Sequence, residues 1–192
     1  MAKLIGLVLV RHGETTGESS IRYHGINDVE LSKLGRAQAE AARLALEGEE
    51  FDELFASPLS RARETARIIL PGRPIRLVED FREVNFGRWE GLTQEEIADR
   101  DPELYDEWRT NPRIFGYPGG DSRSEFLTRV GRGLRGLLAG GATHPLVVAH
   151  KGVIRALAAE LLGEELAGGE PELGAILRLE PRPGEGWRIT GD

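Results

Sequence analysis

The 192-residue chain contains no cysteine. This absence excludes disulfide bonds, thiolate metal sites and a cysteine nucleophile, and it is compatible with the cytoplasmic location that we expect. No apolar run approaches the ~20 residues that a membrane-spanning helix needs. Lys3 precedes a short apolar run, but no small-residue cleavage site follows it. We therefore interpret this run as part of the folded protein rather than as a signal peptide.

Positive charge is outweighed by negative charge, and the formal net charge is −7. This balance argues against an extended nucleic-acid-binding surface, although a small anionic substrate needs only a local cluster of cations. The length suits one domain, and a composition of 40% hydrophobic and 30% charged residues is typical of globular proteins. We expect neither nucleic acid nor a membrane as a partner.

Short apolar runs alternate with helical patterns along the chain, which predicts an α/β fold. The predicted strands are Leu4–Val10, Phe51–Ala56, Pro74–Val78 and Leu146–Ala149, with a terminal hairpin of Ala175–Leu179 and Trp187–Ile189. The predicted helices are Lys33–Leu46, Leu59–Leu70, Thr93–Asp99, Pro102–Trp108, Asp121–Ala139 and Lys151–Leu162. We expect a single domain over residues 1–192. Its three α/β/α layers would contain a mostly parallel central sheet flanked by helices, with a small, mainly helical cap insertion over approximately residues 80–120.

Polar residues follow two of the buried strands directly. Arg11 and His12 come after the first strand, and His150 comes after Leu146–Ala149. Burying an unpaired cation is costly, so these side chains should emerge at the carboxyl edge of the sheet, where open α/β folds bind ligands. A histidine can act as a nucleophile or base, and an arginine matches the geometry of phosphate. The two strands therefore predict one shared site.

Two further residues could complete this site. Arg61 lies in the first turn of a predicted helix, where the helix dipole favours anions. An arginine at this place is awkward for the dipole and is plausible if it faces a phosphate. Glu83 lies in an aromatic-rich segment that could partly desolvate its carboxyl group, which makes it a candidate proton donor.

Six motifs, in this order, resemble those of the histidine phosphatase superfamily, which includes the cofactor-dependent phosphoglycerate mutases and many small phosphatases. The motifs begin at Arg11-His12-Gly13-Glu14-Thr15, Gly25, Ser57-Pro58-Leu59, Glu83, Pro118-Gly119-Gly120-Asp121-Ser122 and His150-Lys151-Gly152. The resemblance covers most of the chain. It implies that His12 is the phosphorylated nucleophile, that Arg11, Arg61 and His150 hold the phosphate, and that Glu83 is the general acid and then the base.

One segment departs from the commonest family pattern. Many members carry a tryptophan-asparagine pair a few residues after the nucleophile, whereas this chain has Gly17-Glu18 and then Ser19-Ser20. Glu18 would repel a phosphate and should point away. Ser19, Ser20 or Arg22 could supply the missing donor. Lys151 stands where a second glycine is common and could add positive charge at the rim.

The resemblance implies a metal-independent phosphomonoester hydrolase without a cofactor, acting on a small phosphorylated metabolite. Its motifs resemble those of α-ribazole-5'-phosphate phosphatases and of broad-specificity acid or sugar-phosphate phosphatases. Phosphoglycerate mutase activity is the alternative, although Glu83 is followed by Val84-Asn85-Phe86-Gly87 rather than by the residues typical of the mutases. A non-catalytic phospholigand-binding module is a further alternative. Pairing of C-terminal edge strands could also form a homodimer.

Other patterns are interpreted as structural. Gly131 begins a literal G-x-G-x-x-G sequence, but that sequence lies inside a helical pattern and not at a strand-to-helix turn, so it does not predict dinucleotide binding. Arg129, Arg132 and Arg135 are expected on a solvated helix face. Asp28 and Ser32 are expected to fix a turn and to cap a helix.

Overall fold

The computed structural model describes residues 4–166, 171–182, 184 and 186–190. The strands are β1 (Leu7–Arg11), β2 (Leu54–Ala56), β3 (Arg76–Leu77), β4 (Leu146–Ala149), β5 (Ile176–Arg182) and β6 (Gly186–Thr190). The helices are α1 (Lys33–Ala45), α2 (Ser60–Ile69), α3 (Gln94–Arg100), α4 (Pro102–Thr110), α5 (Arg123–Ala139) and α6 (Lys151–Leu162). Two short 3₁₀ turns are η1 (Glu79–Phe81) and η2 (Gly87–Trp89).

The strands form one sheet in the order β3-β2-β4-β1-β5-β6. Strands β3, β2, β4 and β1 run parallel, whereas β5 pairs antiparallel with both β1 and β6. The α/β prediction and the terminal hairpin are confirmed. The sheet is mixed because β5 of that hairpin runs antiparallel to β1. Strand β1 begins at Leu7 rather than at Leu4 and extends to Arg11, so Arg11 belongs to the strand itself.

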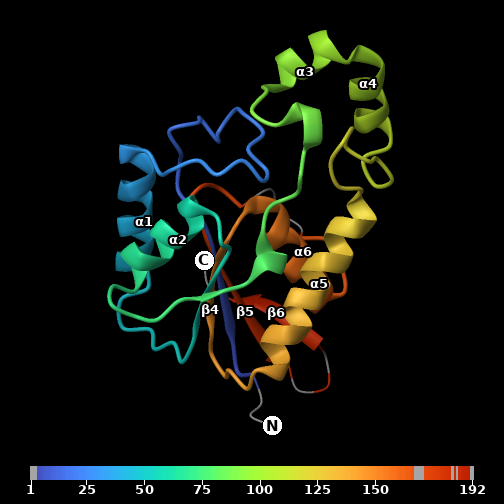
Figure 1. The fold of residues 1–192 in the computed structure, drawn as a ribbon. Coiled ribbons are helices and arrows are strands. Elements are labelled where there is room, and N and C mark those ends of the chain that lie inside the picture. Colours follow the sequence, from blue (N-terminus) through green and yellow to red (C-terminus); the bar gives the residue numbers. More distant parts are fainter. Residues whose placement is uncertain (1–3, 167–170, 183, 185, 191–192) are drawn as a thin grey trace.

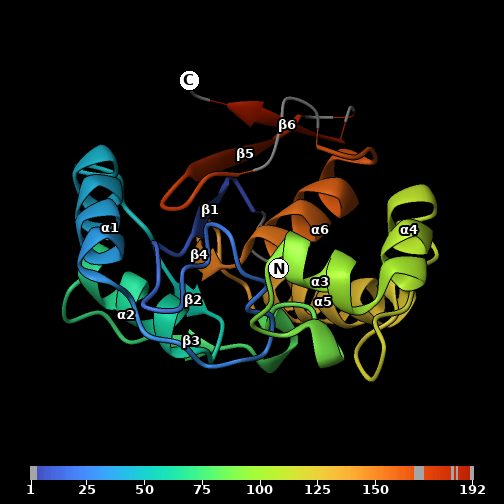
Figure 2. The same ribbon diagram turned by 90° about the horizontal axis from the view of Figure 1, so that it is seen from above.

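Helices cover both faces of the sheet, with α1 and α2 on one side and α5 and α6 on the other (Figure 2). Alternate side chains of β1 point to opposite faces. Leu7 and Leu9 join the core cluster that includes residues of α5 and α6. Val8 and Val10 join the cluster that includes residues of α1 and α2. All four side chains are almost completely buried, as the continuous apolar run predicts for a strand covered on both faces.

The helix starts show how the site-bearing segments are held. Ser32 caps α1 by accepting a hydrogen bond from the backbone N–H of Gly35, as expected. Helix α2 has no capping side chain at its own N-cap. Asp28 supplies the missing acceptor, because its carboxylate accepts from both the backbone N–H and the hydroxyl of Ser60. Asp28 therefore ties the loop before α1 to the helix that carries Arg61.

Helices α3 and α4 stand away from the sheet, at the top of the view in Figure 1. They share a small aromatic core centred on Trp89, Ile97 and Phe115. Trp89 stacks on Phe115 with ring centroids 5.3 Å apart, and its indole N–H donates to Asp101. This core is separate from the two clusters on the sheet, and the segment predicted as a cap over residues 80–120 contains most of it. No helix among the described residues is long and apolar enough to cross a membrane.

Candidate active site

His12 and His150 lie side by side at the carboxyl ends of neighbouring strands. Strands β1 and β4 are parallel neighbours, and Arg11 is level with Ala149, so the next residue of each strand lies at the same edge of the sheet. The two imidazole rings meet edge to face, with centroids 5.1 Å apart. The structure therefore brings together the two histidines that the strand pattern placed at one site.

The hydrogen bonds of His12 define its tautomer. Nδ1 lies 2.7 Å from the carbonyl oxygen of Gly13, which can only accept, so Nδ1 carries the proton. Nε2 then holds a lone pair and accepts a long 3.3 Å contact from Nε of Arg61. Burial and the nearby charge of Arg61 lower the pKa of His12 well below 6.5. His12 is thus a neutral imidazole at neutral pH, with its basic nitrogen at Nε2.

His150 has the opposite tautomer. Its Nδ1 accepts from Nε of Arg61 at 3.3 Å, and its Nε2 donates to Oγ of Ser57 at 2.7 Å. Burial, followed by the charge of Arg61, lowers the pKa of His150 well below 6.5. A protonated His150 would add positive charge behind a bound phosphate. The structure instead favours a neutral ring, because a cationic guanidinium already lies against it and the ring is fully buried.

Arg61 lies beneath the site rather than on its surface, because its side chain has no exposed area. Besides the two histidines, it donates to the carbonyl oxygens of His24, Gly25 and Asn27. Burial lowers its pKa to about 10, and the charges of Glu83, Asp28 and Glu90 oppose that shift. Arg61 therefore remains a cation at neutral pH and joins both histidines to the loop over residues 24–27.

Glu83 reaches the site from the segment between η1 and η2. Its Oε1 accepts from the backbone N–H of Val84 at 3.0 Å, and its Oε2 accepts from the backbone N–H of Gly152 at 2.9 Å. A Cβ atom at position 152 would lie 2.4 Å from Oε1. The glycine after His150 and Lys151 therefore leaves the space that the carboxylate occupies.

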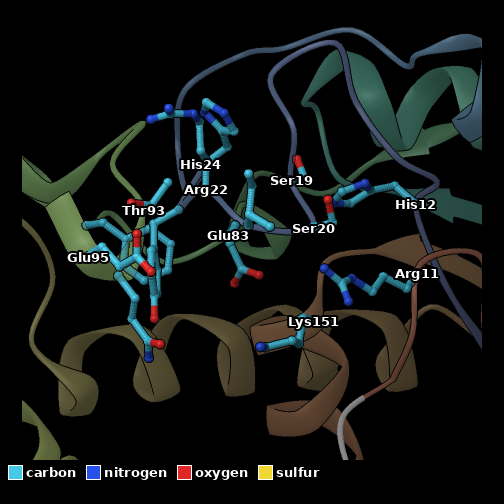
Figure 3. Close-up of a pocket in the computed structure, with 14 residues that line it drawn as sticks. Arg11, His12, Ser19, Ser20, Arg22, His24, Glu83, Thr93, Glu95 and Lys151 are labelled. Carbon is cyan, nitrogen blue, oxygen red and sulfur yellow. The ribbon is translucent and has the colours of Figure 1, made fainter. Parts of the chain in front are cut away.

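His12 and Glu83 border a cleft of about 570 Å³. Arg11, His12, Ser19, Ser20, Glu83 and Lys151 line one part of it, as Figure 3 shows. Thr93, Gln94 and Glu95, at the start of α3, line another part together with Tyr23 and Phe86. Arg61 and His150 lie behind this surface with no exposed area, so the residues predicted at the site form one layer that lines the cleft and a second layer buried behind it.

The loop that departs from the family pattern places both serines at the cleft. Ser19 shares a 2.7 Å hydrogen bond with the hydroxyl of Thr15, and the backbone N–H of Ser20 donates to Glu14. Glu18 pairs with Arg22 instead of lining the cleft, as charge repulsion predicts. Arg22 also lines the cleft, but it forms an ion pair with Glu96.

Three supporting residues were not predicted from the sequence. Glu14 is buried and accepts from the backbone N–H groups of Thr15 and Ser20. Ser57 is buried and accepts from His150. Arg129, expected on a solvated face, instead donates to backbone carbonyls around Glu83. Glu14 and Ser57 both lie within the motifs that resemble the family, and this position was the feature of the sequence that could have identified them.

Within the part of the chain that the structure describes, no group of three or more histidine, aspartate or glutamate side chains could hold a metal ion. The chemistry available to the site comes from a neutral imidazole, a carboxylate and a set of cations. This set matches the transfer of a phosphoryl group to nitrogen, with a carboxyl group placed to move protons.

Comparisons with known proteins point the same way. The sequence model of the histidine phosphatase superfamily (branch 1) matches residues 7–190. The 2-carboxy-D-arabinitol-1-phosphatase of Triticum aestivum is 35% identical over 85% of this chain and 34% of its own length. The adenosylcobalamin/alpha-ribazole phosphatase of Salmonella typhimurium is 35% identical over 81% of this chain and 79% of its own. This chain thus spans about a third of the plant relative but most of the bacterial one.

A solved structure of similar fold is the alpha-ribazole phosphatase of Shigella flexneri. The two chains superpose with a TM-score of 0.85 at 28% identity, covering 98% of this chain and 96% of the other.

Proposed function

Because this chain belongs to the histidine phosphatase superfamily (branch 1), we propose that it hydrolyses phosphate monoesters of small metabolites through a phosphohistidine at His12. The observation that carries this proposal is the tautomer of His12. Nδ1 donates to Gly13, so Nε2 holds the lone pair, and His12 lines the cleft. The contact of Nε2 with Nε of Arg61 is long, at 3.3 Å, and we propose that an incoming phosphoryl group displaces it.

In the first step, Nε2 of His12 attacks phosphorus. An N–P bond forms and the P–O bond to the leaving group breaks. Glu83, which also lines the cleft, gives its proton to the departing ester oxygen, and the product alcohol leaves. The neutral state of His12 supports this step, because a protonated ring nitrogen has no lone pair with which to attack.

In the second step, a water molecule attacks the phosphorus of phosphohistidine. Glu83, now a carboxylate, accepts a proton from that water, and the N–P bond breaks to regenerate His12 and release inorganic phosphate. Dividing the hydrolysis into two displacements lowers the barrier of a reaction that is very slow in water.

The remaining residues would stabilise charge on the phosphoryl oxygens. Arg11 and Lys151 line the cleft, so they are placed to contact phosphate directly, and Ser19 and Ser20 would replace the asparagine of other family members. Arg61 and His150 are buried behind His12. We propose that the charge of Arg61 acts on the phosphoryl oxygens from beneath, and that His150 holds the Arg61 guanidinium in place through Nδ1. The fixed cation Arg61 would favour the transition state without needing to reorganise.

The substrate class follows from the relatives. Their names describe phosphatases of α-ribazole and of a carboxylated sugar alcohol, so we propose a phosphorylated metabolite of sugar or nucleoside type. The start of α3 would contact its leaving group, because Thr93, Gln94 and Glu95 line the cleft on that side. A cap formed by residues 80–120, a homodimer and a cytoplasmic location stay predictions.

The decisive experiment measures inorganic phosphate released from p-nitrophenyl phosphate, α-ribazole phosphate and 3-phosphoglycerate in the presence of a chelator. We expect chelator-resistant turnover that His12→Ala abolishes. His144→Ala is a matched control, because His144 precedes β4 and lies outside the cleft. An alkaline quench followed by mass spectrometry should detect phosphate on His12.

Other outcomes would identify the alternatives. Exchange of phosphate between phosphoglycerates without net release would indicate a mutase. Binding of these esters without turnover would indicate a phospholigand-binding module. Turnover that survives His12→Ala would show that the assignment of the nucleophile is wrong.

A further inference from the structure

We propose that Arg129 is a positioning residue that holds Glu83 in its catalytic place. The proposal rests on the proposed function, because it assumes that Glu83 moves protons. Glu83 does not lie on a helix or a strand but between η1 and η2. Such a segment needs contacts from outside itself to hold one geometry.

Arg129, on α5, supplies these contacts through both terminal nitrogens of its guanidinium group. Its Nη1 donates to the carbonyl oxygens of Asp80 at 3.0 Å and Arg82 at 2.8 Å. Its Nη2 donates to the carbonyl oxygen of Glu83 at 3.2 Å. A single side chain thus binds three backbone carbonyls in the turn that carries the proposed acid.

Asp121 extends this arrangement to the residues that follow Glu83. Its Oδ2 accepts from Nη2 of Arg129 at 3.0 Å and from the backbone N–H of Asn85 at 3.0 Å. The backbone N–H of Asp121 donates in turn to the carbonyl oxygen of Asn85 at 2.9 Å. The Arg129–Asp121 pair therefore holds the chain on both sides of Glu83.

Helix α5 is a rigid base for this pair. The Arg129 guanidinium lies 5.1 Å from the ring centroid of Phe126, one turn earlier, and the Arg129 side chain is only 22% exposed. At Gly133, one turn later, η1 approaches so closely that a Cβ atom would lie 2.7 Å from the ring of Phe81. One glycine of the literal G-x-G-x-x-G pattern thus leaves the space into which η1, just before Glu83, packs.

The chemistry needs this precision because proton transfer requires the carboxyl group to lie within hydrogen-bond reach of the leaving oxygen. A displacement of about 1 Å can lower a rate by about 10²-fold. Arg129 does not line the cleft, so its effect would pass through Glu83. A lysine could not replace it, because an ammonium group lacks the planar fork that reaches several acceptors.

The test compares two esters of similar size, p-nitrophenyl phosphate and benzyl phosphate. p-Nitrophenolate is a weak base and leaves without a proton, whereas the benzyl alkoxide needs one. We would measure kcat/KM, which reports on the steps up to departure of the leaving group, in Glu83→Gln, Arg129→Gln and Arg129→Lys. Arg135→Gln is the control, since Arg135 lies on the same helix but pairs with Glu160 of α6.

We expect Glu83→Gln to lower kcat/KM for benzyl phosphate by about 10²-fold or more while changing that for p-nitrophenyl phosphate much less. Arg129→Gln should show the same selective loss of roughly 10²-fold, Arg129→Lys should not restore it, and Arg135→Gln should behave as the wild type. An unchanged rate on p-nitrophenyl phosphate also shows that the variant is folded.

Three results would overturn the assignment of Arg129. These are an equal loss on both esters, no loss on either, or full recovery with lysine. If Arg129→Gln does not fold, Arg129→Lys carries the same comparison. A Glu83→Gln variant without any leaving-group dependence would instead overturn the assignment of Glu83 as the acid, which separates failure of the proposed function from failure of this inference.

Discussion

The backbone N–H of Gly152 donates to Oε2 of Glu83 across 2.9 Å, joining the start of α6 to the proposed acid. The contact depends on glycine, because a Cβ atom at position 152 would lie 2.4 Å from Oε1 of the same carboxylate. The proposed proton donor and the strand end that carries His150 are therefore fixed to each other.

We predict that Gly152→Ala displaces the Glu83 carboxylate and lowers kcat/KM for benzyl phosphate by about 10²-fold. The fold should persist, since the clash involves the far end of a flexible side chain. Gly136→Ala, on α5, is the control because its added methyl group would meet nothing within 4 Å. It should leave activity unchanged and stabilise the protein by up to about 1 kcal/mol. Wild-type turnover by Gly152→Ala would contradict this role for the glycine.

At Gly133 the predicted effect is on stability. An alanine methyl group there would press on Phe81 and on Cβ of Asp80, both closer than 3 Å. Overpacking of this kind costs about 1–3 kcal/mol, which exceeds the gain in helix propensity of alanine over glycine. Urea denaturation should therefore show a lower free energy of unfolding for Gly133→Ala than for the wild type. An increase, such as we expect for Gly136→Ala, would show that η1 can move away without cost.

Stability should depend on pH through the two buried histidines. Burial and the charge of Arg61 lower the pKa of both His12 and His150 well below 6.5. In the unfolded chain they titrate near ~6.5, so below that pH the unfolded state binds more protons than the folded one. The free energy of unfolding should fall on acidification, by up to about 1.4 kcal/mol per pH unit for each histidine. Well above pH ~6.5 both rings are neutral in both states, and this contribution to the slope disappears.

Urea titrations at several pH values between 5 and 8 would measure this slope. A His150→Gln variant removes one of the two titrating groups. Below pH ~6.5 its free energy of unfolding should therefore change less per pH unit than that of the wild type, by the contribution of one histidine. Identical slopes in the variant and the wild type would show that His150 does not remain neutral in the folded protein.

Asp28 should matter for stability although it lies outside the cleft. Asp28→Ala removes the acceptor for the backbone N–H and the hydroxyl of Ser60 at the start of α2. Loss of a cap of this kind costs about 0.5–2 kcal/mol. Thermal or urea unfolding should detect it, with Asp99→Ala, an exposed residue on α3, expected within about 0.5 kcal/mol of the wild type. An equal effect of the two substitutions would mean that the contact with Ser60 contributes nothing.

Local sequence patterns were enough to predict the helices and strands, and the edge of the sheet at which the candidate active-site residues lie. Uncharged, branched runs predicted β1 and β4, and the polar residues directly after them predicted that His12 and His150 would lie together. These inferences succeed because hydrophobic periodicity and strand ends are local properties. The motifs identified the family for the same reason, since each is a short run of adjacent residues.

The layers of the site, and the contacts that hold its residues in place, could not be predicted from local patterns and became visible in the folded protein. The burial of Arg61 behind the histidines and the neutral state of His150 depend on loops and charges from segments that are far apart in the sequence. Periodicity placed Arg129 on the same helix face as its exposed neighbour Arg132, although Arg129 is covered by a turn 46 residues away in sequence. Its partners are backbone carbonyls, which every residue possesses, so no pattern of side chains in the sequence predicts the contact.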